Sequence, residues 1–133
     1  MNSSYVLDSY ALLVHLEDEP GAEKVRRILR KASTGNARLF VSAINLGELY
    51  YIALREMGLE KAEEALFLVE QLPIQIAGAD LAMTLKAARL KGMHPVAYAD
   101  CFAAALALQE NAKLLTGDPE FRKFGDTLSV EWI

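Results

Sequence analysis

The sequence predicts a single α/β domain of three layers, in which a mostly parallel central sheet of about four to five strands carries helices on both faces. Two observations lead to this fold class. Short apolar, β-prone runs alternate with longer segments of helical periodicity, which is typical of a parallel sheet covered by crossover helices. The length of 133 residues suits one domain, and no internal repeat, low-complexity segment or linker divides the chain.

The expected strands are short apolar runs that end at polar or turn-forming residues. The first run ends at Asp8, and the fourth is followed by the turn Thr116-Gly117-Asp118. In chain order, strands are expected at Ser4–Asp8, Arg38–Val41, Ile74–Ala77, Lys113–Leu115 and Thr127–Val130.

The expected helices fill the segments between these strands. From Val96 to Leu108 only Asp100 is formally polar, and a helix that is apolar all round is covered on every side. The segment from Ile44 to Met57 is nearly as apolar, and Glu48 is the acid in its early part. The other helices are expected at Ser9–Leu16, Ala22–Lys31, Glu60–Leu72 and Ala79–Lys91.

Composition narrows the function classes. The net charge of -4 argues against a general polyanion binder, because nucleic-acid affinity rests largely on neutralising phosphates. The single cysteine, Cys101, allows no intramolecular disulfide, fits a reducing compartment and is expected in packing. No apolar run reaches transmembrane length and no signal-peptide pattern is present, so a cytoplasmic protein without a membrane partner is expected.

Four carboxylates are expected to converge at one edge of the sheet. Asp8 and Asp118 follow strands, Glu48 lies one helical turn past the second strand, and Asp100 lies early in its helix. The carboxyl ends of parallel strands share one edge, where α/β proteins bind ligands. Two unit charges about 5 Å apart repel by roughly 3 kcal/mol at an effective dielectric near 20, so a divalent cation is the expected counter-charge.

The chemistry of this donor set favours hard ions. Oxygen-only ligands select Mg²⁺ or Mn²⁺ over Zn²⁺, and His15 and His94 lie outside these turns, where surface or packing roles are expected. A carboxylate cage suits phosphodiester hydrolysis, in which one metal activates water and a second, about 3.5 to 4 Å away, stabilises the leaving oxygen. The hydroxyl of Thr116 could hold a metal-bound water, and a role in its turn is equally consistent with the sequence.

Each acid also has a structural interpretation when it is taken alone. Asp118 before Pro119 is typical of a helix N-cap with proline at the first helical position. Asp100 near a helix start would interact with the helix dipole. Asn45 at a cap with Glu48 three residues later fits a capping box. The functional interpretation therefore rests on all four acids together.

A basic stripe marks the helix expected at Ala22–Lys31. Such a stripe is most often a solvated face, and contact with a nucleic acid or an acidic partner is the alternative. Because the whole chain is acidic, binding of a nucleic acid would have to be local or bridged by metal ions. The members of the stripe are Lys24, Arg26, Arg27, Arg30 and Lys31.

Together the acidic motifs resemble those of the PIN domain family, particularly the VapC-like toxins of toxin-antitoxin pairs. The matching segments span almost the entire chain and are Val6-Leu7-Asp8-Ser9, Val41-Ser42-Ala43, Gly47-Glu48-Leu49, Ala99-Asp100 and Thr116-Gly117-Asp118. The resemblance implies a PIN-like fold and a Mg²⁺- or Mn²⁺-dependent endoribonuclease that forms a homodimer and is silenced by an antitoxin whose tail occupies the active-site groove. It also assigns the site to Asp8, Glu48, Asp100, Asp118 and the hydroxyl of Thr116.

Other function classes fit the sequence less well. A phosphoacceptor receiver domain needs an acidic pair after its first strand, and Asp8 stands alone there. A phosphatase with an aspartate nucleophile needs a second aspartate two residues later, where this chain has Tyr10. A non-catalytic interaction module with the same fold is the remaining alternative, and it gives no reason for a carboxylate cluster that binds Mn²⁺.

Overall fold

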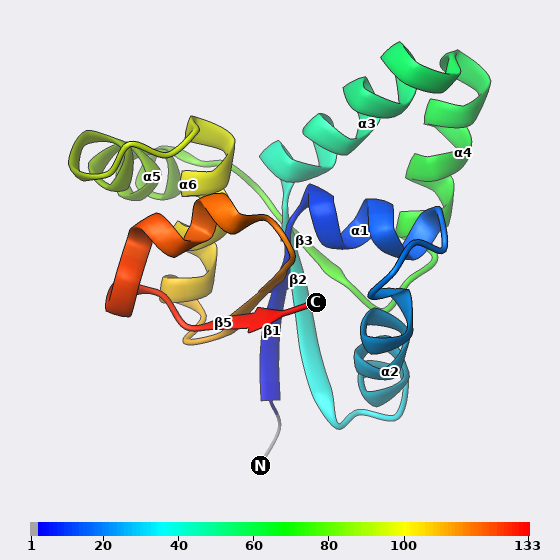
Figure 1. Ribbon diagram of the computed structural model, residues 1–133, viewed down its shortest axis with the longest axis horizontal. Coiled ribbons are helices and arrows are strands. Elements are labelled where there is room, and N and C mark those ends of the chain that lie inside the picture. The colour runs from blue at the N-terminus through cyan, green and yellow to red at the C-terminus, as the bar shows by residue number, and fades with distance from the viewer. Residues whose placement is uncertain (1–2) are drawn as a thin grey trace.

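A computed structural model describes residues 3–133, which form a five-stranded sheet between two layers of helices (Figure 1). The strands are β1 Ser3–Leu7, β2 Ala37–Ser42, β3 Gln75–Ala77, β4 Lys113–Thr116 and β5 Val130–Trp132. Their order across the sheet is β3-β2-β1-β4-β5, and every neighbouring pair is parallel. The predicted fold class is therefore confirmed.

Six α-helices and one 3-10 helix join the strands within residues 3–133. They are α1 Ser9–Leu16, α2 Ala22–Ser33, α3 Ala43–Met57, α4 Leu59–Glu70, α5 Leu81–Met93, α6 Tyr98–Gln109 and the 3-10 helix η1 Pro119–Thr127.

Strand side chains alternate between two apolar cores, as the period of two in a β-strand requires. Val6 and Leu114 point to the face covered by α5, α6 and η1. Leu7 and Leu115 point to the opposite face, which α1, α2 and parts of α3 and α4 cover. Figure 1 shows these two groups of helices on opposite sides of the sheet. Helix α6 is buried on every side from Cys101 to Ala107, as its apolar sequence predicts, but Tyr98 and Leu108 at its ends are 44% and 45% exposed.

Several segment boundaries differ from the sequence prediction by one to three residues, and two of these differences have a clear local cause. The last strand was expected at Thr127–Val130 but occupies Val130–Trp132, because η1 uses the preceding residues to bury Phe121 and Phe124. Helix α5 begins at Leu81, two residues later than expected, because Asp80 caps it by accepting a hydrogen bond of 2.9 Å from Met83 N.

The fold gathers several chain segments at the carboxyl edge of the sheet. Helix α1 follows β1 after a single residue, α3 follows β2 without a gap, and η1 begins three residues after β4. Helix α6 runs antiparallel to the strands, so its first turn reaches the same edge, where Figure 1 shows the starts of α1, α3 and α6 close to the ends of β1 and β2. The expected convergence of strand ends and helix starts therefore occurs at this edge.

Candidate active site

Asp8 occupies the junction between β1 and α1 and is only 2% exposed. It is the N-cap of α1, because its Oδ1 accepts a hydrogen bond of 2.9 Å from Ala11 N. Its Oδ2 accepts a bond of 2.5 Å from the hydroxyl of Thr116 at the end of β4. The sequence prediction placed Asp8 at the end of a strand but missed the cap, for which an aspartate directly before a helical run is the usual signal.

The pKa of Asp8 is raised to about 7, chiefly because burial removes water from the carboxylate. The hydrogen bonds from Thr116 and Ala11 act in the opposite direction and favour the ionised form. The negative charges of Asp100 and Asp118 raise the pKa further. Asp8 is therefore close enough to two other acids of the predicted set to interact with both.

Thr116 connects Asp8 to the backbone of Asp118. Its hydroxyl donates to Asp8 and accepts a hydrogen bond of 3.0 Å from Asp118 N, and its side chain is completely buried. The turn role that the sequence left open is thus present. Asp118 caps η1 by accepting a bond of 3.0 Å from Glu120 N, and Pro119 follows it as the first helical residue, so the capping interpretation of Asp118 is also confirmed.

Glu48 lies in the second turn of α3 and is held by α1. The hydroxyl of Ser9 donates a hydrogen bond of 2.5 Å to Glu48 Oε1. The alternative interpretation of Asn45 and Glu48 as a capping box is wrong, because Ser42 caps α3 by accepting a bond of 3.2 Å from Ile44 N. Asn45 instead lies inside the helix and is fully buried. Glu48 is therefore free of a capping task, and Ser9 is a site residue to which the sequence analysis gave no role.

Asp100 lies in the first turn of α6, whose N-cap is Ala97 and has no side-chain capping bond. Its position suits an interaction with the helix dipole, as one sequence interpretation expected. The pKa of Asp100 is raised to about 7, first by partial burial and then by the charges of Asp118, Glu48 and Glu120. Within residues 3–133, the charged groups that act on this carboxyl are all acids.

The four predicted acids are thus close enough for their charges to interact, and the charge of the exposed Glu120 also acts on Asp100. The donor atoms are all oxygens, which suits a hard divalent cation. As the side chains stand, no three Asp, Glu, His or Cys residues of the described chain are near enough together to share a metal ion. Joint metal binding therefore requires side-chain rotation, which is open to Asp100 and Asp118 because both are only half-buried.

The histidines and the cysteine occupy packing or partly buried positions. His94 packs its ring against Phe124 with the ring centroids 4.9 Å apart, and His15 is half-buried on α1. Cys101 is fully buried next to Asp100, which confirms the packing role expected from the sequence.

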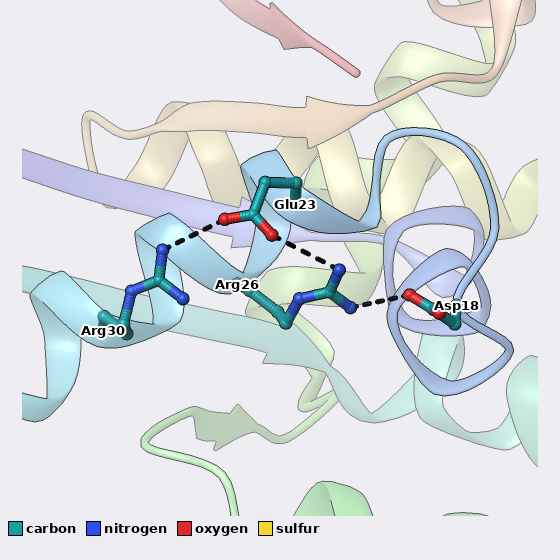
Figure 2. A network of polar contacts seen from close by, with 4 residues as sticks. All are labelled: Asp18, Glu23, Arg26 and Arg30. Atoms are coloured by element: carbon teal, nitrogen blue, oxygen red, sulfur yellow. Dashed lines mark hydrogen bonds and ion pairs between the residues drawn. The ribbon is translucent and has the colours of Figure 1, made fainter.

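The basic stripe on α2 is largely engaged in ion pairs. Arg26 contacts Asp18 at 2.9 Å and Glu23 at 3.4 Å, and Arg30 contacts the other oxygen of Glu23 at 3.2 Å (Figure 2). These pairs are exposed and contribute little to stability.

The remaining stripe residues differ in their surroundings. Lys24 contacts Glu131 at 2.6 Å and donates a hydrogen bond of 2.8 Å to the carbonyl of Trp132, so it anchors β5. Helix α2 ends just before β2 begins, so Lys31 lies toward the sheet edge opposite the acids. Arg27 is near Glu131, whose pKa it helps to lower. The stripe therefore does not extend as one continuous surface to the carboxylates.

Comparison with known families decides the classification. The family model of the PIN domain matches residues 5–126. The chain belongs to the PIN domain family. This confirms the family predicted from the four acidic motifs, and the match contains all four acids of the site. No curated protein sequence is similar enough to this PIN domain to count as a match.

Solved structures of toxin-antitoxin proteins share the fold. A chain of DNA-bound VapBC from Salmonella typhimurium is 18% identical with a TM-score of 0.77, covering 98% of each chain. VapBC2 from Rickettsia felis, bound to a promoter DNA fragment, is 20% identical with a TM-score of 0.76 over 96% of this chain and 97% of that one. VapC20 from Mycobacterium tuberculosis, described as a sarcin-ricin loop cleaving toxin, is 15% identical with a TM-score of 0.71 over 92% and 95%. At such identities the similarity shows the fold alone.

Within residues 3–133, no helix of this PIN domain is both long enough and apolar enough to cross a membrane.

Proposed function

We propose that this PIN domain is a Mg²⁺- or Mn²⁺-dependent endoribonuclease that hydrolyses RNA phosphodiester bonds, and that it is the toxin of a VapBC-type toxin-antitoxin pair. One observation carries the proposal: four carboxylates lie close enough together that Asp100 and Asp118 act on Asp8, and Asp118 and Glu48 act on Asp100. Such crowding favours a divalent cation as the balancing charge. The toxin would act in the cytoplasm, where RNA is available.

The residues of the site have separate tasks in this proposal. Asp8, Glu48, Asp100 and Asp118 would hold the metal, which when bound would lower the pKa of a water molecule and offset charge on the phosphate. Asp8 is fixed by its bonds from Ala11 and Thr116, and Glu48 is fixed by Ser9. Asp100 and Asp118 are half-buried and therefore reachable by both ions and substrate.

The proposed partners are a cognate antitoxin and a second copy of the chain. Structures of VapBC complexes share this fold, which supports an antitoxin partner. The α3–α4 hairpin exposes large apolar side chains, as expected of a surface that another protein covers. Tyr51, Leu59 and Phe67 are 50%, 60% and 59% exposed. An antitoxin tail that reaches the four acids should carry Arg or Lys, which pair with carboxylates.

The alternatives are distinguishable from the nuclease. A receiver domain has the strand order 2-1-3-4-5, whereas the order here is β3-β2-β1-β4-β5. A non-catalytic PIN-like module has the same fold, and it is therefore the alternative that only an activity measurement can exclude.

Cleavage of RNA by the purified, metal-stripped chain should require added Mg²⁺ or Mn²⁺. The all-oxygen acid set supplies ligands but no nucleophile of its own, so EDTA should abolish cleavage and Mn²⁺ should restore it. The assay follows the appearance of new RNA 5′ ends, with Asp80→Asn as a control because Asp80 caps α5 outside the cluster. Cleavage that persists in excess EDTA would refute metal dependence, and absence of cleavage with every metal and RNA would favour the non-catalytic module.

The basic stripe remains the candidate for contacts to the RNA backbone, and Arg27 and Lys31 test it best because Lys24, Arg26 and Arg30 contact carboxylates. If the stripe binds RNA, the double variant Arg27→Ala, Lys31→Ala should bind more weakly and lower the salt slope by about one for each lost phosphate contact. Binding is measured to an uncleaved RNA between about 50 and 200 mM salt. An unchanged affinity and slope would identify the stripe as a solvated face.

A further inference from the structure

Asn45 is a fully buried polar residue, and only one of its two polar side-chain atoms has a partner. It lies in the first turn of α3 with no exposed surface. Its Nδ2 donates a hydrogen bond of 3.2 Å to the carbonyl of Ala99, and its Oδ1 is buried without a partner. Within residues 3–133, the only other such orphan atom is His15 Nδ1. A buried amide with an unpaired oxygen lowers stability relative to an apolar side chain of similar size.

The position of Asn45 connects the two helices that carry Glu48 and Asp100. Residues three apart on a helix are neighbours on its surface, so Asn45 lies one turn before Glu48 on the same side of α3. Ala99 directly precedes Asp100 in the first turn of α6. The bond from Asn45 therefore joins α3 near one acid to the backbone of α6 beside the other. Within the part of the chain that the structure describes, it is the only hydrogen bond from a side chain that joins α3 to α6.

This link connects the turns that carry two of the four acids. Glu48 lies one turn after Asn45 and Asp100 directly follows Ala99, so the bond from Asn45 to Ala99 ties the two helices together at this point. Ser9 holds Glu48 from the α1 side, and Asp100 has no comparable side-chain anchor in the described chain. The Asn45 amide is thus placed where it can fix the backbone that carries Asp100 relative to α3.

We propose that Asn45 is a positioning residue that sets the separation of the Glu48 and Asp100 carboxylates for joint binding of a divalent cation. The inference rests on the proposed function, because it assigns Asn45 a task toward the metal. Groups that orient metal ligands typically change metal affinity by 10- to 100-fold when they are removed. In this interpretation, the buried Oδ1 of Asn45 lowers the stability of the fold, and the protein tolerates this loss because Nδ2 has to lie beside Ala99.

The test compares Asn45→Leu and Asn45→Ala with the wild type by calorimetric titration of Mn²⁺ into metal-stripped protein and by thermal melts in EDTA. Leucine has a similar size and removes the orphan oxygen, so Asn45→Leu should melt in EDTA at the same temperature as wild type or higher. Both variants should nevertheless bind Mn²⁺ at least tenfold more weakly. Asn45→Ala keeps the test valid if leucine does not fit. Val69→Ala is the stability control, because it opens the opposite core and should lower melting without changing Mn²⁺ affinity.

The outcomes separate this inference from the proposed function. Mn²⁺ affinity within twofold of wild type in both Asn45 variants would overturn the inference and make Asn45 a structural residue only, while leaving the nuclease proposal intact. Wild-type protein that binds no Mn²⁺ at all would overturn the metal-dependent nuclease and the inference with it. A tenfold or greater loss in both variants, alongside unchanged affinity in Val69→Ala, would support the positioning role.

Discussion

Replacing Asp100 with asparagine should abolish RNA cleavage and at the same time stabilise the metal-free protein. Asparagine has nearly the same shape but cannot be ionised, so the change removes one of several crowded negative charges. We expect a gain of about 1 kcal/mol in the free energy of unfolding near pH 8, after screening and partial protonation reduce the Coulomb repulsion. Cleavage should fall by several orders of magnitude, because a ligand of the activating metal is lost.

A matched control separates the cluster from helix capping. Asp80 is an aspartate that caps α5 through Met83 N and is not among the charges that act on Asp8 or Asp100. Asparagine is about as good an N-cap as aspartate, so Asp80→Asn should change stability by only a few tenths of a kcal/mol and leave cleavage unchanged. The measurements are thermal melts in EDTA and a cleavage assay. An Asp100→Asn variant that cleaves RNA like wild type would leave the nuclease without its central residue.

The second large effect is an inverted pH dependence of stability without metal. Asp8 and Asp100 have folded pKa values near 7, whereas the unfolded value is close to 3.8. Between these two pH values the folded state binds more protons than the unfolded state, so the free energy of unfolding falls as the pH rises from about 4 to about 7. A shift of about three units corresponds to at most about 4 kcal/mol for one buried group, and the half-buried Asp100 contributes less.

Thermal melts in EDTA at pH 5, 6, 7 and 8 measure this dependence. The melting temperature should fall across the series, and Asp8→Asn should fall less because it no longer titrates. Other groups with shifted pKa values, such as His15 and Glu17, remain in both proteins, so the difference between the two series reports Asp8 together with its interaction with Asp100. Saturating Mn²⁺ should flatten the wild-type series, since it binds the ionised carboxylates. Identical slopes in the two proteins would contradict a raised pKa for Asp8.

Much of the fold was predictable because each strand and helix has a recognisable pattern within its own segment of the sequence. The alternation of buried strand runs with helical periodicity places Asp8 and Thr116 at strand ends, and parallel strands then bring those ends to one edge. The nearly uninterrupted apolar sequence of α6 likewise predicts that residues Cys101–Ala107 are buried and that Asp100 is the acidic residue in its first turn.

The details that sequence could not supply are contacts between residues far apart in the chain. Nothing local to Ser9 shows that its hydroxyl meets Glu48, 39 residues later. The alternative of Asn45 as the cap of α3 fails because β2 runs directly into the helix and Ser42, the last residue of the strand, is also the cap. The last strand was placed too early because the 3-10 helix η1 extends to Thr127, and 3-10 runs of that length are uncommon.

The claim that the four acids form one metal site is tested most directly by calorimetric titration of Mn²⁺ into metal-stripped wild type and Asp100→Asn. Titrations at pH 6.5 and 8.5, each in two buffers of different ionisation enthalpy, count the protons released. We expect wild type to bind Mn²⁺ and release protons at pH 6.5 but hardly any at pH 8.5, because Asp8 and Asp100 have pKa values near 7. Asp100→Asn should bind at least tenfold more weakly. No detectable binding by wild type, or equal affinity in the two proteins, would contradict the site.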